Sequence, residues 1–225
     1  MSPDAETTPR RAMGRPRATS RPELERLAFE LFAARGFDET TVDDIAAAAG
    51  IGRRTFFRYV PSKNDLVWGD FEKQLAGLRR LLAEADPAEP LMAVLHRAVL
   101  ELNRFDPRTT AEYRRRMQLI LAAPTLRADA TLRYEAWRAV VAEFTSHRTG
   151  HPRDALLPRL VANVLLSAAL TSYEQWLSHE EGPTLEELLD TALTHAATGL
   201  ARALADETST RTRGEPRGAA DEEPS

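Results

Sequence analysis

Four basic side chains stand close together between residues 51 and 64, a stretch that contains no acidic residue: Arg53, Arg54, Arg58 and Lys63. A guanidinium group can donate two parallel hydrogen bonds to O6 and N7 of guanine, so adjacent arginines suit the reading of a base edge. The first residues of a recognition helix are the ones that meet base edges in the major groove. Arg53 and Arg54 therefore predict a sequence-reading contact with DNA. The alternative is a solvated basic helix on an ordinary helical bundle.

Two short helices joined by a tight turn are expected to position these arginines. Thr40 and Thr41 are candidate N-caps of the first helix, because an aspartate follows each of them by three residues. Gly50 can adopt the left-handed conformation that ends a helix. We expect the second helix over residues 53–59, with Pro61 stopping it. This pattern is typical of a helix-turn-helix.

The side chains expected at the DNA come from the caps, from the second helix and from the start of the helix after it. Lys63 follows the cap residue Ser62, where the helix dipole and the ammonium group both attract a phosphate. Thr55, Phe57 and Tyr59 are expected to lie against the sugar-phosphate backbone. The complete expected set is Thr40, Thr41, Arg53, Arg54, Thr55, Phe57, Tyr59 and Lys63.

Composition limits the classes of function. The 225-residue chain has a net charge of -4, which argues against a sequence-blind nucleic-acid binder. Residues 1–64 hold 11 basic and 9 acidic side chains, a net charge of +2, and the remainder holds 19 and 25, a net charge of -6. A mildly basic head on an acidic body orients a protein toward DNA. Because the chain has no cysteine, thiol catalysis, disulfides and cysteine-ligated metals are excluded.

No motif for catalysis, a metal or a cofactor is evident. The sequence lacks the phosphate-binding G-x-x-x-x-G-K pattern and the G-x-S-x-G nucleophile elbow. His147 and His151 are four residues apart, but Gly150 and Pro152 break the helix that would align them on a metal. The arginines near the N-terminus are not followed by an apolar core, so this segment is not a signal peptide. The longest apolar stretch, 160–170, is too short to span a membrane and contains two polar residues. We therefore expect a cytoplasmic protein with no membrane partner.

Apolar residues recur at helical spacing through most of the chain, and no strand pattern or internal repeat is evident. We expect an all-α protein, with a helix over 20–36 completing the head and one long helix over 62–85 linking head and body. Expected body helices cover 91–105, 109–123, 128–147, 155–179 and 184–204. The expected domains are a disordered basic arm at 1–19, which either enters a minor groove or is a solvated tail, the helix-turn-helix domain at 20–66, a ligand-binding and dimerisation domain at 67–204 and a disordered tail at 205–225.

Polar and amphipathic residues interrupt the apolar body helices. Tryptophan and tyrosine with a few amides are a usual lining of an apolar ligand pocket, although a satisfied core position is an equally good interpretation of any one of them. Arg114, Arg115 and Arg116 form a basic run that is either solvated or set at a pocket mouth, and we assign the second role to Arg115. The expected ligand-binding set is Asn103, Arg115, Gln118, Tyr134, Trp137, Asn163 and Ser167.

The last two expected helices carry broad apolar and small-residue faces, which allow helices to approach closely, as in a four-helix bundle. We expect these faces to form the interface of a symmetric homodimer. Such a dimer would hold two recognition helices for two half-sites.

The stretch G-x-x-x-x-T-F-F-R-Y-V-P-S-K-N-D-L, which starts at Gly50, closely resembles the DNA-binding signature of TetR-family bacterial transcriptional regulators. The family usually has Tyr where Phe57 stands and Phe where Val60 stands, so a hydroxyl that often touches phosphate is absent here. Most of the chain also resembles the mycofactocin-system regulators of actinobacteria. The stretches that carry this likeness are T-V-D-D-I-A-A-A-A-G-I-G-R-R-T-F-F-R-Y, V-W-G-D-F, T-L-R-Y-E-A-W-R-A-V-V-A-E-F and Y-E-Q-W-L.

The family resemblance implies a homodimeric repressor that binds a palindromic double-stranded operator and responds to a small molecule. The closer resemblance implies control of mycofactocin biosynthesis genes, with a long-chain acyl-CoA as effector. A TetR-type repressor of another regulon, with a different apolar effector, is the alternative within this class. An enzyme that uses the apolar pocket and a helical protein-interaction module are the alternatives outside it.

Overall fold

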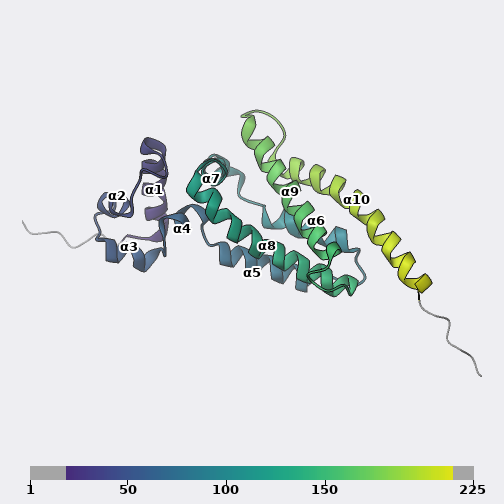
Figure 1. Cartoon of the computed structure of the whole chain (residues 1–225). Coiled ribbons are helices and arrows are strands. Elements are labelled where there is room, and N and C mark those ends of the chain that lie inside the picture. Colours follow the sequence, from purple (N-terminus) through teal and green to yellow (C-terminus); the bar gives the residue numbers. More distant parts are fainter. Residues whose placement is uncertain (1–18, 215–225) are drawn as a thin grey trace, which may run out of the picture. The chain divides into compact units, whose positions relative to one another are not determined.

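A computed structural model describes residues 19–214, with side chains up to residue 200 (Figure 1). The described part of the chain is helical and contains no strand, which confirms the all-α prediction. The chain divides into two compact units, Met1–Gly69 and Asp70–Ser225, close to the expected boundary at residue 66. The expected basic arm, up to residue 18, and residues 215–225 of the expected tail lie outside the described residues.

The N-terminal unit contains four described helices: α1 (Arg21–Arg35), α2 (Val42–Ala48), α3 (Arg53–Tyr59) and α4 (Lys63–Trp68). α1 packs against α2 and α4, and α2 packs against α3. The side chains that these helices share form a small apolar core: Leu24, Ala28, Phe32, Phe37, Ile45, Phe56, Val60 and Leu66. This core fixes the α2–α3 pair relative to α1.

The prediction of a single helix over 62–85 is wrong. The structure has two helices there, α4 and α5 (Phe71–Ala83), which are separated at Gly69 and Asp70. Gly69 has φ 66° and ψ -143°, a conformation that L side chains rarely adopt. Asp70 then caps α5, because its carboxylate accepts a hydrogen bond from the backbone N–H of Lys73 at 3.1 Å. The apolar spacing continues across the break, which is why the pattern did not reveal it.

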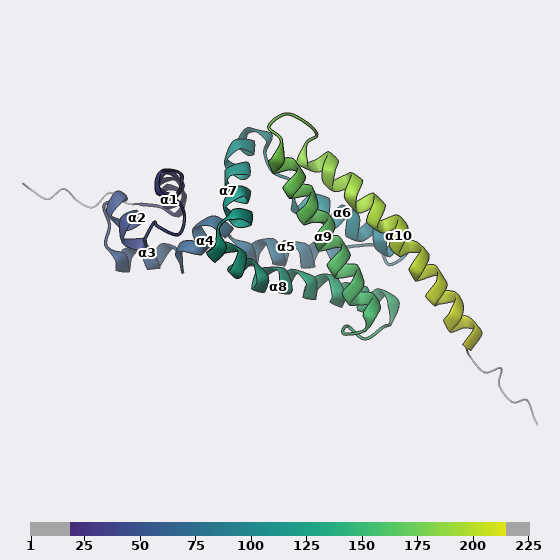
Figure 2. The same cartoon turned by 45° about the horizontal axis from the view of Figure 1, so that its top comes forward.

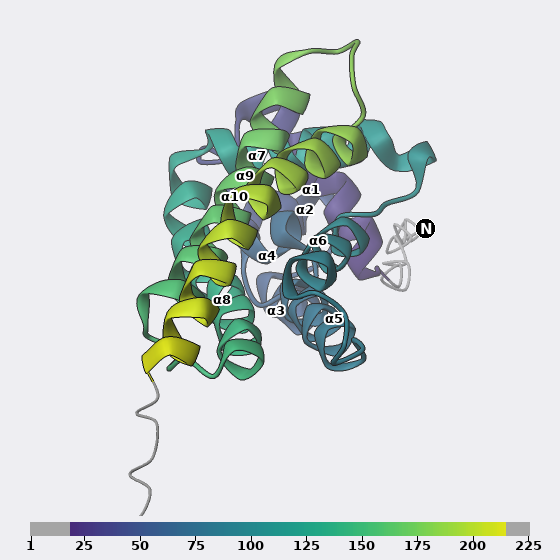
Figure 3. The same ribbon diagram turned by 90° about the vertical axis from the view of Figure 1, so that its right-hand side faces the viewer.

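The C-terminal unit is a bundle of helices (Figures 2 and 3). α9 packs against α8 and α10, α6 packs against α5 and α10, and α7 packs against α8 and α9. Figure 2 shows α9 and α10 running side by side after the turn that joins them. After α5 the described elements are α6 (Leu91–Leu102), the 3-10 turn η1 (Pro107–Thr109), α7 (Thr110–Ala122), α8 (Pro124–Thr149), α9 (Leu156–Ser178) and α10 (Leu185–Gly214).

Two helix boundaries differ from the expected ones by four residues or more. α8 begins at Pro124 and not at residue 128, because proline is favourable at the first helical position, where its missing N–H has no partner to lose. α10 continues to Gly214, ten residues past the expected end at 204. The residues after 204 are polar but contain no proline before Pro216, so the helical hydrogen-bond ladder is not interrupted.

α9 is the one helix in the described part of the chain that is long and apolar enough to cross a membrane. Half of its most apolar window is buried inside the structure, against neighbouring helices of the body. Its buried residues include Leu157, Val161, Leu165 and Trp176. This burial is the pattern of a core helix in a folded domain.

Candidate nucleic-acid interface and effector site

The α2–α3 pair has the geometry of a helix-turn-helix. α2 begins with a capping box, in which Thr41 Oγ1 accepts from the Asp44 N–H at 3.1 Å and Asp44 Oδ2 accepts from the Thr41 N–H at 2.8 Å. Gly50 has φ 66°, and the N–H of Ile51 closes the helix end on the Ala46 carbonyl oxygen at 2.9 Å. α3 then begins at Arg53, as the sequence predicted.

The start of α3 presents both expected arginines to solvent. Arg53 forms an ion pair from Nη1 to Asp43 Oδ2 at 2.8 Å, and its guanidinium lies 5.5 Å from the centre of the Phe57 ring. Arg54 makes no hydrogen bond or ion pair with the described residues. All the side-chain donors of Arg54 are therefore available to a ligand. Arg53 must first break its ion pair with Asp43 before it can bind one.

Further along α3, one exposed cation was missing from the expected set. Arg58 is exposed, and it lies one helical turn beyond Arg54, on the same side of the helix. Its Nη2 approaches the Tyr59 hydroxyl at 3.5 Å. Phe57 is 43% exposed, and Thr55 and Tyr59 are half-buried. Arg54, Phe57 and Arg58 thus form one continuous outward face, which the basic spacing of the sequence could have indicated.

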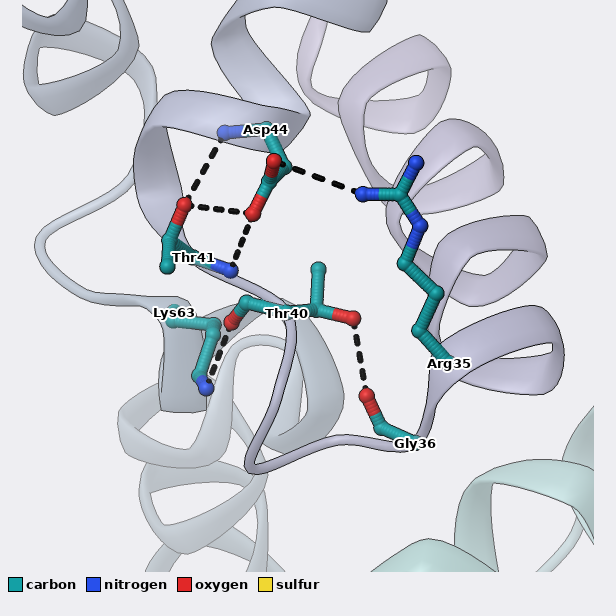
Figure 4. Close-up of polar contacts among 6 residues, drawn as sticks. All are labelled: Arg35, Gly36, Thr40, Thr41, Asp44 and Lys63. Atoms are coloured by element: carbon teal, nitrogen blue, oxygen red, sulfur yellow. Dashed lines mark hydrogen bonds and ion pairs between the residues drawn. The ribbon is translucent and has the colours of Figure 1, made fainter.

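Lys63 directs its ammonium group into the N-terminal unit (Figure 4). Its Nζ donates to the carbonyl oxygens of Phe37 and Thr40, each at 2.8 Å, and lies 4.2 Å from the centre of the Phe37 ring. Burial lowers the pKa of Lys63, and the nearby carboxylates of Asp38 and Glu39 act in the opposite direction. In the structure the Lys63 ammonium group therefore has partners in the α1–α2 loop, and its expected contact with a phosphate stays a prediction.

Thr40 is also turned away from the expected DNA contact. Its side chain is fully buried, and Oγ1 donates to the Gly36 carbonyl oxygen at 2.8 Å. Thr41 is the true cap of α2 and is exposed, with its hydroxyl 2.5 Å from Asp44 Oδ2. Arg35 joins this group through an ion pair from Nη1 to Asp44 Oδ1 at 3.4 Å (Figure 4). Thr41 and not Thr40 caps α2, because the hydroxyl of Thr40 is already bonded to the Gly36 carbonyl oxygen in the α1–α2 loop.

In the body, a chain of buried and half-buried polar groups links three helices. Tyr173 of α9 donates from its hydroxyl to Asn103 Oδ1 at the end of α6, and the hydroxyl oxygens of Tyr173 and Tyr113 of α7 lie 2.7 Å apart. Burial raises the pKa of Tyr173 well above its usual value and also raises the pKa of Tyr113. Both phenols are therefore neutral hydrogen-bonding groups near neutral pH. Of these three residues, only Asn103 was expected to bind ligand.

The remaining expected ligand residues do not converge on one place. Tyr134 is half-buried, and burial, followed by the charge of Glu174, raises its pKa to about 12. Trp137 is buried in the core. Four members of the set are exposed: Arg115, Gln118, Asn163 and Ser167. A pattern of polar residues among apolar ones does not reveal which side of a helix each residue occupies.

Arg114 has a fixed structural position. Its Nη2 donates to the carbonyl oxygen of His179 at 2.7 Å, just past the end of α9, and its guanidinium lies 4.5 Å from the centre of the Trp176 ring. A cation at a helix C-terminus satisfies carbonyl groups that have no partner within the helix. The solvated role assigned to Arg114 is therefore replaced by a cap on α9.

Comparisons with known proteins place this geometry in a family. Residues 26–67 match the model of bacterial regulatory proteins of the tetR family, and residues 89–201 match the MftR C-terminal domain. The chain is 43% identical over 190 residues to the putative mycofactocin biosynthesis transcriptional regulator MftR of Mycobacterium tuberculosis, a match that covers 84% of this chain and 96% of that protein.

The chain belongs to the TetR family of transcriptional regulators. It is also 30% identical over 168 residues to the HTH-type transcriptional regulator TcmR of Streptomyces glaucescens, which covers 70% of this chain and 73% of that one. The putative TetR-family transcriptional regulator from Syntrophomonas wolfei has the same fold, with a TM-score of 0.58 at 16% identity over 80% of this chain and 94% of that one. The SmeT–triclosan complex also shares the fold, with a TM-score of 0.57 at 18% identity over 80% and 90% of the two chains.

As a TetR-family regulator related to MftR, the protein uses its N-terminal unit for DNA binding. The structure brings Thr41, Arg53, Arg54 and Phe57 to the surface of that unit. The hydroxyl of Thr40 and the ammonium group of Lys63 instead donate to carbonyl oxygens of the α1–α2 loop.

Proposed function

We propose that the protein is a homodimeric repressor that binds a palindromic operator in the cytoplasm and is released from it by a small molecule. The observation that carries the DNA assignment is Arg54, exposed near the start of α3 with no partner among the described residues. The capped α2 and the closed turn after it fix the start of α3, so the reading residues are held on rigid elements.

An outward face of α9 supports the dimer. Leu156 is 79% exposed and Leu160 is 39% exposed, which is unusual for leucines in a helix whose other side is core. Asn163 and Ser167 continue the same face at helical spacing and are also exposed. Ser167 fits a subunit interface on this face, and Asn163 also lines an open pocket of about 460 Å³ between α8 and α9, so its expected role as a ligand residue stays a prediction. Pairing two protomers would place one recognition helix at each half-site.

The proposed regulon is the set of mycofactocin biosynthesis genes. The proposal rests on the 43% identity to a relative whose name carries that assignment. The test is to incubate the purified protein with fragmented genomic DNA of its source and to sequence the retained fragments. Enrichment of a palindrome upstream of mycofactocin genes supports the proposal. Enrichment elsewhere identifies another regulon and another class of effector, while the repressor assignment stands.

A long-chain acyl-CoA is the proposed effector. Arg115 is exposed on α7, whose other side buries Met117 and Ile120, so a basic group and an apolar layer lie on one helix. An acyl tail would gain about 0.8 kcal/mol per buried CH₂, and arginine is a good partner for phosphate groups. The effector must bind the DNA-free conformation more tightly, because equal affinity for both conformations shifts nothing.

The effector test is release of fluorescently labelled operator by acyl-CoAs of graded chain length. We expect release to weaken steadily as the chain shortens, and free CoA to have no effect. Arg115→Ala should weaken release without changing operator affinity, whereas Arg108→Ala, at an exposed arginine of η1, should change neither. Release by free CoA, or by no acyl-CoA, would exclude this effector. Turnover of an acyl-CoA without DNA would favour the enzyme alternative.

A further inference from the structure

A second ligand site is indicated by a cavity at the C-terminal end of α6. The cavity has a volume of about 190 Å³ and lies among the end of α6, η1, the end of α9 and the start of α10. An engineered apolar cavity of about 150 Å³ is large enough to bind benzene, so a single-ring molecule fits here. Its apolar walls are Leu100, Phe105, Trp176, Leu185 and Leu189.

The aromatic walls of this cavity are fixed by contacts with residues of α7. Phe105 stacks on Tyr113 with ring centres 4.3 Å apart, and the guanidinium of Arg114 lies over the Trp176 ring. Tyr113 is in turn bonded to Tyr173, which donates to Asn103. The aromatic surfaces and the Asn103 amide are therefore pre-organised, which lowers the entropic cost of binding a ligand between them.

The polar groups of the cavity wall favour a ligand that carries a hydrogen-bond acceptor. The Asn103 amide donates one N–H to the Val99 carbonyl oxygen at 2.7 Å and accepts from Tyr173, so its second N–H has no partner among the described residues. The hydroxyl of Thr110 already donates to the Pro107 carbonyl oxygen at 2.6 Å. The hydroxyl of Thr184 lies 3.0 Å from a carboxylate oxygen of Glu187, to which it donates. A ligand carbonyl oxygen would pair with the spare amide proton.

The charged groups at the rim balance one another. Arg104 Nη1 lies 2.8 Å from Glu101 Oε2, and Arg104 Nη2 lies 3.9 Å from Glu186 Oε1. A cation already shared by two carboxylates offers little attraction to an anionic ligand. The rim therefore favours a neutral molecule.

We propose that this cavity binds a compact, neutral carbonyl compound of about one ring in size. The carbonyl oxygen accepts the free Asn103 N–H, and the ring lies between Phe105 and Trp176. The ligand touches α6, α9 and α10 together, so its binding stabilises the body. The site is separate from the Arg115 region and does not depend on the acyl-CoA proposal.

Cyclohexanone is the probe, and methylenecyclohexane is the matched ligand in which a CH₂ group replaces the carbonyl oxygen. Calorimetric titration of the full-length protein, without DNA or acyl-CoA, should show cyclohexanone binding. Leu100→Phe fills the cavity and should lower this affinity at least tenfold, whereas Leu132→Phe, the same change at an exposed residue of α8, should leave it unchanged.

Two-dimensional NMR gives a second measurement that needs no variant. Cyclohexanone should shift the side-chain amide signals of Asn103 in the wild-type protein, and methylenecyclohexane should shift them less. Asn103→Asp, which keeps an acceptor for Tyr173 but removes the amide donor, should abolish the preference for the ketone. Absence of binding, binding that survives Leu100→Phe in a folded variant, or an unshifted Asn103 amide would each overturn the proposal. Operator binding is not used in either measurement, so these results are independent of the repressor assignment.

Discussion

Lys63 Nζ lies 2.8 Å from the carbonyl oxygen of Thr40, so the first residue of α4 is tied to the loop that precedes α2. The same ammonium group donates to the carbonyl oxygen of Phe37. One side chain thus closes the α1–α2 loop over α4. Its expected partner in the sequence analysis was a phosphate, and the structure gives it a partner within the protein.

Lys63→Met should therefore destabilise the protein. The substitution keeps the apolar stem but leaves two loop carbonyls without their charged donor, and hydrogen bonds to charged groups contribute roughly 1.5–3 kcal/mol each at most. We expect a lower urea midpoint and only a small change in the salt dependence of operator binding. A stable variant whose salt slope falls by about one would instead show that Lys63 neutralises a phosphate.

Arg54→Ala should weaken operator binding by roughly 1–3 kcal/mol and relax sequence preference if the arginine reads a base. Arg53→Ala should cost less, because Arg53 must leave its ion pair with Asp43 before it can bind DNA. The measurement is fluorescence anisotropy with the operator and with single-base variants. Arg108→Ala is the control in the body, and equal affinity in all three variants would contradict the assignment.

Gly69→Ala should destabilise the protein by on the order of 1–3 kcal/mol, because alanine is strained at φ 66° and ψ -143°. Gly77→Ala is the matched control inside α5, where an added Cβ meets no atom within 4 Å. Alanine there should stabilise the helix by roughly 0.5–1 kcal/mol. Opposite shifts of the unfolding midpoint are expected, and a stabilising Gly69→Ala would favour the continuous helix that the sequence suggested.

Gly199→Arg should convert a dimer to a monomer if α10 belongs to the interface. The position is exposed and has open space around it, so a single protomer can accommodate the side chain. Leu160→Glu tests the outward face of α9 in the same way, and Leu132→Glu is the control at another exposed leucine. Light scattering measures the mass. A dimer that survives both interface variants would place the interface elsewhere.

Tyr134 should make stability fall at alkaline pH. Its pKa is raised from 10.0 to about 12 in the folded protein, so between these values the native state holds a proton that the unfolded state has lost. Stability from this group is present below pH 10 and declines as pH rises toward 12. Tyr134→Phe should show a shallower decline of unfolding free energy in this range. Identical slopes for the two proteins would refute the shift.

The sequence by itself determined the local features of this protein. The cap–aspartate spacing, Gly50 and Pro61 predicted α2, the turn and α3, because caps and turn residues act through hydrogen bonds within a few positions of the chain. Helical apolar spacing likewise predicted an all-α body. The motif around Arg53 and Arg54 was sufficient to indicate the family, which the comparisons confirmed.

The tertiary structure decided which side chains are available. Lys63 and Thr40 looked equivalent to the other polar residues of the motif, yet each is bound to a carbonyl of the α1–α2 loop. Asn163 and Asn103 both interrupt apolar helices, but Asn163 is exposed and lines an open pocket with residues of α8, whereas Asn103 is half-buried and lines the cavity at the end of α6. Tyr113 and Tyr173 are 60 residues apart and meet only when α7 packs on α9. Such pairings depend on which helix faces meet, and spacing along one helix carries no information about its neighbours.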